Sequence, residues 1–163
     1  MIIEYNIPSP VDVTALNIFV RALCAYDVLW LRRNPRTPNL YESGVRYKTQ
    51  PAGVEQFKPI PLVIAAGSAD CDQLAPWRAA ELRVRRGIKA LPEVRQMGPA
   101  LYHVYVRLPN GQVEDVSARL GMAVPKKIIA QGRAILAQKG RSRVSQRVPT
   151  AGSAFLRAPN YWG

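Results

Sequence analysis

The sequence has few of the residues on which most catalytic and metal sites are built. It contains one histidine, His103, and two cysteines, Cys24 and Cys71, in 163 residues. One histidine and two distant cysteines cannot form a tetrahedral zinc site without two carboxylates, and no paired-ligand spacing is present. No P-loop, dinucleotide fingerprint or Gly-x-Ser-x-Gly elbow occurs either. We therefore expect neither a metal ion nor a cofactor.

Long uncharged stretches are also missing. Runs such as 59–69 and 97–106 fall well short of the roughly 18 residues that a membrane span needs. Residues 1–5 lack the basic and apolar regions of a signal peptide, and two cysteines make no disulfide scaffold. We expect an intracellular, reduced protein without a membrane span.

Acidic residues are absent from the last 48 positions. All 11 lie within 1–115, where 14 Lys+Arg leave a net charge of +3, whereas 116–163 carries nine Lys+Arg and a charge of +9. Such a segment attracts nucleic acid, anionic membrane or an acidic protein by the same Coulomb force, so its sign names no partner. Residues 141–163 also lack an apolar period. The predicted organisation is one domain over 1–140 and an extended arm over 141–163.

Periodicity and end signals predict three helices and a hairpin. The first helix starts with Ser9 as cap and ends near Arg33, with Cys24 as an inert core thiol. The second lies within 70–86 before Gly87, and the third spans 125–138. The proline-rich stretch 36–61 is typical of loop, and strands are expected at 101–108 and 112–116.

Cys71 stands where an apolar, strand-like run ends and the second helix begins. A helix N-terminus stabilises a thiolate through its dipole and free N–H groups, so a cysteine there can act as a nucleophile. Asp70 and Gln73 fit a capping pair, although Asp70 and Asp72 as anions would raise the pKa of the thiol. A buried structural cysteine beside a helix cap is the alternative, and the local sequence favours neither.

The turn of the hairpin decides which acid faces His103. A two-residue loop would place Glu114 on the same face as the histidine. The sequence Leu-Pro-Asn-Gly at 108–111 instead fits a type I turn within a three-residue loop, which shifts the register and pairs His103 with Ser117. Asp115 then becomes a diagonal neighbour of the histidine, within side-chain reach. A plain surface pair of histidine and acid is the alternative.

Four segments together resemble the transglutaminase-like branch of the papain-like cysteine peptidases. That family shows a Gly-Asp-Cys-Asp motif opening a helix, a helix end before Gly-Ile, a strand histidine and an acid on the next strand. Residues 41–47 and 77–83 are similar to small tailed-phage proteins that carry this core, and the match covers about 60–122. The four segments are Gly67-Ser68-Ala69-Asp70-Cys71-Asp72-Gln73-Leu74-Ala75, Arg85-Arg86-Gly87-Ile88-Lys89-Ala90, Tyr102-His103-Val104-Tyr105-Val106 and Glu114-Asp115.

The resemblance implies an α+β fold of transglutaminase-like, papain-like type, in which the helix bearing the cysteine packs on an antiparallel sheet, with an extended basic C-terminal arm. It implies Cys71 as nucleophile, His103 as general base and acid, and Asp115 as the orienting carboxylate. Two residues depart from the pattern: Ala69 replaces a glycine, and Pro76 lies within the helix. Pro76 predicts either a kinked helix or a helix that starts near it and leaves the cysteine on a loop, and the second case would indicate a retired site.

Three functions follow as expectations. The first is a phage-encoded cysteine hydrolase, a peptidase or amidase associated with the virus particle. The second is a structural protein of the neck or tail, of connector or adaptor type, that keeps the fold with or without activity. The third is a nucleic-acid-binding module driven by the basic tail. The expected partners are other virion proteins, further copies of the chain and, through the tail, nucleic acid; the expected location is the virion or the host cytoplasm.

Overall fold

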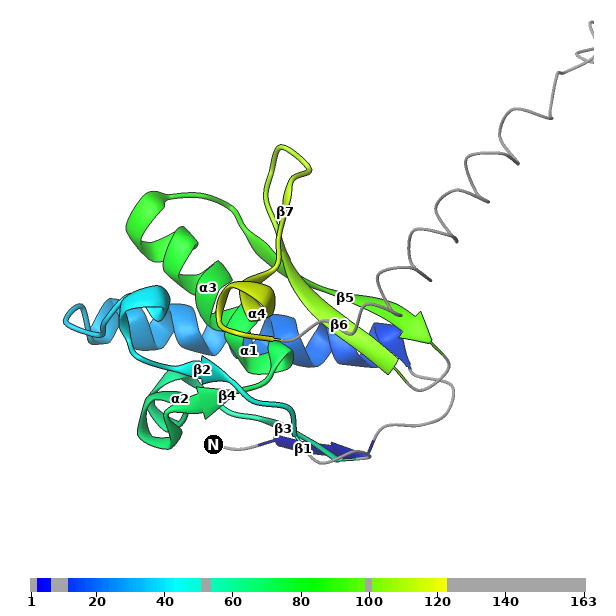
Figure 1. The fold of residues 1–163 in the computed structure, drawn as a ribbon. Helices are drawn as coiled ribbons and strands as arrows, with labels where there is room; N and C mark the ends of the chain where they lie inside the picture. Colours follow the sequence, from blue (N-terminus) through cyan, green and yellow to red (C-terminus); the bar gives the residue numbers. More distant parts are fainter. Residues whose placement is uncertain (1–2, 7–11, 51–53, 99–100, 123–163) are drawn as a thin grey trace, which may run out of the picture. The chain divides into compact units, whose positions relative to one another are not determined.

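The computed structural model describes residues 3–6, 12–50, 54–98 and 101–122 (Figure 1). By its internal contacts the chain divides into two units, Met1–Val124 and Pro125–Gly163, and the described residues all belong to the first unit. The helix expected over 125–138 and the arm expected over 141–163 therefore lie outside the described residues.

Helices and strands are mixed along the described part of the chain, which agrees with the expected α+β class. One sheet is β5-β6-β7, all antiparallel; β1 pairs antiparallel with β3, and β2 pairs parallel with β4. The helices are α1 (Val13–Arg33), α2 (Ile60–Ala66), α3 (Cys71–Arg86) and α4 (Val116–Arg119), with a short 3-10 helix η1 (Leu40–Glu42). The strands are β1 (Ile3–Asn6), β2 (Arg46–Tyr47), β3 (Val54–Phe57), β4 (Ser68–Ala69), β5 (Leu91–Gly98), β6 (Leu101–Arg107) and β7 (Val113–Glu114).

The core forms where α1 lies along α3 and against the β5–β6 hairpin (Figure 1). The apolar side of α1 predicted from the sequence is buried there, Cys24 included, and it meets the fully buried Trp77 of α3 and Val104 and Val106 of β6 in one cluster.

By length and composition α1 is also the one helix of the described residues that could cross a membrane, which is weak evidence because core helices pass the same test. Its buried residues include Leu16, Val20, Leu23, Cys24 and Leu31.

The start of α1 differs from the prediction and its end does not. The helix begins at Val13, and Asp12 is its cap because the Asp12 carboxylate accepts a hydrogen bond from the N–H of Ala15 at 2.9 Å. The expected cap at Ser9 is therefore wrong. The helix ends at Arg33 as predicted, since Asn34 turns out of the helical conformation.

The stretch predicted as loop between the first two long helices contains several short elements. It includes η1, β2, β3 and the first two residues of α2. The apolar run at 59–69 is also not a strand, because Ile60–Ala66 forms α2 and leaves only two residues for β4. Gly67 ends α2 with φ of 67°, a left-handed conformation that glycine adopts without a steric cost. The chain is thereby turned directly into β4 and the start of α3.

Candidate active site

Cys71 is the first residue of α3, and Asp70 is the cap of that helix. The helix runs from Cys71 through Pro76 to Arg86, so of the two alternatives that Pro76 left open, the one with the cysteine on a loop is wrong. Of the predicted capping pair, Asp70 is confirmed as the cap and Gln73 is wrong as its partner. Asp70 Oδ1 accepts a hydrogen bond from the N–H of Cys71 at 2.6 Å, and the side chain of Gln73 donates to the carbonyl of Gln56 on β3 instead of closing back on the cap.

The sulfur of Cys71 lies against β6, the strand that carries the histidine. The helix that Cys71 begins packs against β6, where the backbone N–H of Val104 acts to lower the pKa of the thiol, and Cys71 is only 6% exposed. Burial raises the pKa of the thiol well above its ordinary value, and the carboxylates of Asp70 and Asp72 raise it further, whereas the Val104 N–H works against them. The thiol is therefore protonated at neutral pH.

A group of carboxyls surrounds the start of α3. Asp72 is fully buried, and burial together with Glu55 and Asp70 raises its pKa. Burial and the charge of Asp70 also raise the pKa of Glu55, to about 7. Gln50 donates from its backbone N–H to Asp70 at 2.9 Å and from its side chain to Asp72 at 3.4 Å. Burial and the same carboxyls raise the pKa of the neighbouring Tyr102. Asp72, Glu55 and Tyr102 therefore all lose their protons at a higher pH than such groups ordinarily do.

The register of the hairpin is the one predicted from its turn. Arg107 pairs with Val113, and the N–H of Leu108 donates to the carbonyl of Gln112 at 2.8 Å, which leaves a three-residue loop. Gly111 closes that loop with φ of 84°, a conformation that favours glycine. The expected three-residue loop is thus confirmed.

This register brings His103 and Asp115 together. His103 Nε2 and Asp115 Oδ1 lie 3.1 Å apart. The expected strand pairing of His103 with Ser117 is wrong, because β7 ends at Glu114 and Ser117 belongs to α4. Asp115 is instead the cap of α4, and its Oδ1 also accepts a hydrogen bond from the N–H of Ala118 at 3.0 Å.

The charge of Asp115 is favoured by these contacts. Partial burial works to raise its pKa, but the hydrogen bonds from His103 and from the backbone of α4 outweigh burial and hold the pKa below its ordinary value. His103 itself is 8% exposed and meets the ring of Tyr105 edge to face, with the centroids 4.5 Å apart. The imidazole is therefore fixed by a charged acceptor on one side and an aromatic ring on another.

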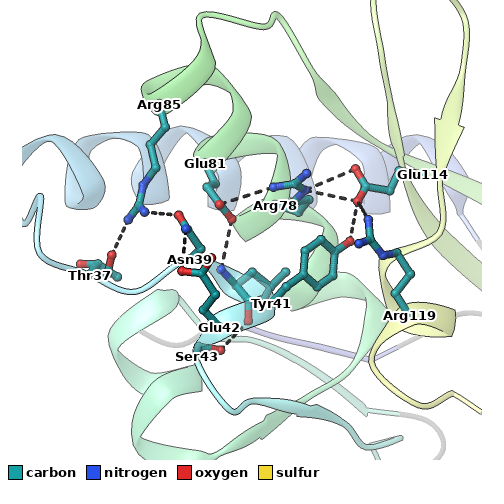
Figure 2. Close-up of polar contacts among 11 residues, drawn as sticks. Thr37, Asn39, Tyr41, Glu42, Ser43, Arg78, Glu81, Arg85, Glu114 and Arg119 are labelled. Atoms are coloured by element: carbon teal, nitrogen blue, oxygen red, sulfur yellow. Dashed lines mark hydrogen bonds and ion pairs between the residues drawn. The ribbon is translucent and has the colours of Figure 1, made fainter.

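Glu114, the acid that the prediction assigned to the opposite face, is at the centre of a second network (Figure 2). It accepts hydrogen bonds from the hydroxyl of Tyr41 at 2.5 Å, from Arg78 at 3.3 Å and from Arg119 at 2.9 Å. The guanidinium groups of Arg78 and Arg119 lie over the ring of Tyr41, 5.0 and 4.0 Å from its centroid. Arg78 also pairs with Glu81 at 3.4 Å. The network ties β7 to α3, α4 and η1.

The structure therefore places Cys71 against the strand of His103 and joins His103 to Asp115. Sequence reasoning missed the partners that come from the stretch read as loop, namely Tyr41, Gln50 and Glu55. Gln50 and Glu55 are single polar residues without a sequence pattern that marks a site, and Tyr41 was noted only within the resembling segment 41–47, without a role. The carboxyls beside Cys71 were visible as the Asp-Cys-Asp pattern.

Comparison with family models, with curated proteins and with solved structures finds no match to this chain. Within the described residues, no group of three or more His, Cys, Asp and Glu side chains is arranged to hold a metal ion. What the site can do is therefore argued from its own geometry.

Proposed function

We propose that the chain is a cysteine hydrolase of transglutaminase-like, papain-like fold, a peptidase or amidase with Cys71, His103 and Asp115 as its triad. The observation that carries the proposal is the 3.1 Å contact between Asp115 and His103, which lies on β6, the strand packed against the helix that Cys71 begins. A nucleophile, a base and a group that orients the base are the three parts that nucleophilic catalysis needs. The cysteine at a helix start and the histidine on a strand of an antiparallel sheet support the same fold family.

In the proposed reaction, His103 accepts the thiol proton and the Cys71 sulfur attacks the carbonyl carbon of an amide. The carbonyl oxygen becomes an oxyanion, and the C–N bond then breaks as His103 returns the proton to the leaving amine. A thioester remains on Cys71. Water, deprotonated by His103, attacks the thioester and releases a carboxylic acid and the free thiol. Because Asp115 engages Nε2, Nδ1 is the ring nitrogen that exchanges protons in both steps.

The thiol is activated by His103 during the reaction, because burial and the two flanking carboxylates hold it in the protonated form beforehand. A preformed thiolate would need the opposite environment, an electropositive and partly exposed one. The proposed enzyme therefore relies on general-base catalysis, and its reactivity rises with pH.

A second function, a structural protein of a phage neck or tail that retains this fold, is favoured by one specific contact. The backbone N–H of Cys71, the natural donor for an oxyanion at this position, is bound at 2.6 Å by its own cap residue, Asp70. Hydrolysis requires Asp70 to release this N–H, whereas a structural protein does not. The elevated pKa of the thiol fits the structural role as well.

Alkylation with iodoacetamide across pH, mapped by mass spectrometry, tests the proposal. Cys71 should react in the folded protein at a rate that rises with pH, and His103→Ala should slow it about a hundredfold or more, the lower end of the usual contribution of a general base. Cys24 is the internal control, because it is 1% exposed and burial raises its pKa to about 11. A Cys71 that reacts no faster than Cys24, or equally fast in His103→Ala, would contradict the hydrolase and favour the structural protein.

A further inference from the structure

A cluster of exposed cations lies at the ends of the two longest helices. Arg32 and Arg33 belong to the last turn of α1, and Arg85 and Arg86 to the last turn of α3. Two more cations follow the helices directly. The six residues of this helix-end patch, all exposed, are Arg32, Arg33, Arg36, Arg85, Arg86 and Lys89.

The two helix ends adjoin each other. The guanidinium group of Arg85 donates to the carbonyl of Thr37 and to the side chain of Asn39, both in the segment that follows α1 (Figure 2). Asn39 in turn donates to Glu42 at 2.8 Å, which is the acid nearest to this contact in sequence. The patch is therefore one surface that two helices and the segment after α1 build together.

The charge of the patch is not used inside the described part of the chain. None of its six cations forms an ion pair with a described acid, in contrast to Arg78, Arg95, Arg107 and Arg119. Compensation of the helix dipoles explains cations in the last turns. It does not explain Arg36 and Lys89, which lie beyond α1 and α3. Six like charges on one surface cost repulsion unless an anionic partner offsets it.

We infer that the helix-end patch binds the phosphate backbone of nucleic acid. Five of its six cations are arginines, whose planar guanidinium groups match phosphate oxygens two at a time. A protein interface is usually anchored by buried aromatic rings, and none of the large exposed hydrophobic side chains in the described residues is aromatic. Among the described residues the surface thus offers clustered charge without an exposed aromatic ring, although the aliphatic Leu29 and Ile88 are exposed near it, and this suits a uniform polyanion better than an acidic protein. The inference concerns the folded unit and does not depend on the hydrolase.

Binding of the full chain to short random-sequence duplex DNA, measured by fluorescence anisotropy over a series of salt concentrations, tests the inference. The patch variant is Arg32→Ala/Arg33→Ala/Arg86→Ala, and the control is Arg21→Ala/Arg46→Ala/Lys48→Ala, three exposed cations elsewhere. Both lose three charges and keep the basic segment 123–163 intact. The patch variant should bind at least about tenfold more weakly, and its log-log salt slope should fall by roughly 2 to 3.

Three outcomes would overturn the inference: an unchanged patch variant, a control that weakens binding as much as the patch variant does, or poly-glutamate or phosphatidylserine vesicles bound with the same dependence on the patch as DNA. The first two would assign DNA binding to the total charge or to other segments. The third would assign the patch to an acidic protein or to a membrane surface. Thermal melting of both variants shows whether the fold is retained.

Discussion

Asp27 is a carboxyl group placed in the core by α1. Its Oδ1 accepts a hydrogen bond from the N–H of Ile60 at 3.1 Å, which caps α2 from a distance in sequence, while Oδ2 is buried without a hydrogen-bond partner among the described residues. Burial raises the pKa of this residue to about 8, and the hydrogen bond from Ile60 only partly opposes it. The folded protein therefore holds a proton that the unfolded chain releases.

This proton makes the stability of the protein depend on pH. The stabilisation is complete below the ordinary aspartate pKa of about 4 and is lost as the pH rises through 8. Thermal melting of the wild type should show the Tm falling over this range. Asp27→Asn keeps the acceptor for Ile60 without a titrating group, so its Tm should fall less steeply. Asp27→Ala should lower the Tm at every pH, and equal slopes in wild type and Asp27→Asn would contradict the assignment.

Asp115 serves two partners at once, the imidazole of His103 and the first turn of α4. Asp115→Asn keeps an oxygen acceptor for both and should leave the Tm nearly unchanged. Asp115→Ala should cost about 1 kcal/mol of unfolding free energy, the usual cost of a lost cap, and should also slow the alkylation of Cys71. Urea unfolding and the alkylation assay measure the two effects. A stable Asp115→Ala protein would show that the cap contributes little.

At the residue scale, the contacts of the site that could be predicted are those between residues close to one another in the sequence. Asp115 could be chosen over Glu114 because a turn of three residues and the two-residue period of a strand determine which side chains share a face. Glu55 and Gln50 could not be placed, since their contacts with the start of α3 depend on how a long irregular segment folds back. No local rule describes such a segment.

Among the elements, α3 shows which sequence signals are strong. Its predicted range and its closing Gly87 are confirmed, with φ of 65° at the glycine. β5 was not predicted, and it contains Pro92; the structure shows why a proline is tolerated there, because β5 is the edge strand of its sheet, where a missing N–H need not break the pairing. The run at 59–69 was misassigned because a short helix and a short strand can have the same apolar composition, and in α2 only Ile60 and Val63 are buried.

The turn between β6 and β7 gives a prediction for one element. Gly111→Ala places a side chain at φ of 84° and should destabilise the protein by about 1 kcal/mol, although no atom outside the turn obstructs the new methyl group. Gly98→Ala is the matched control, because Gly98 does not have a positive φ and the added carbon would meet only Leu101, at an ordinary 3.6 Å. Urea unfolding compares the two. Equal losses would contradict the conformational explanation.

On the scale of the whole molecule, charge is distributed unevenly along the sequence. The segment 141–163 contains four arginines and no acid, and it lacks the apolar period that would offset its ordering entropy. We expect deletion of 141–163 to leave a soluble monomer with the Tm of the full chain and to abolish assembly. Light scattering and thermal melting test this. A truncated chain that unfolds would show that the segment belongs to the core.

Asp115 both accepts a hydrogen bond from His103 and caps α4, and these two roles affect how its presence in a related sequence should be interpreted. Selection for a folded domain alone is enough to keep an acceptor at the start of α4, so the acid can persist in a lineage that has lost all chemistry. His103 has no such second duty in the hydrogen bonds of the described residues, since its ring is bonded to Asp115 alone. If the proposed hydrolase activity exists, the histidine, and not the acid, is therefore the position whose replacement would mark its loss.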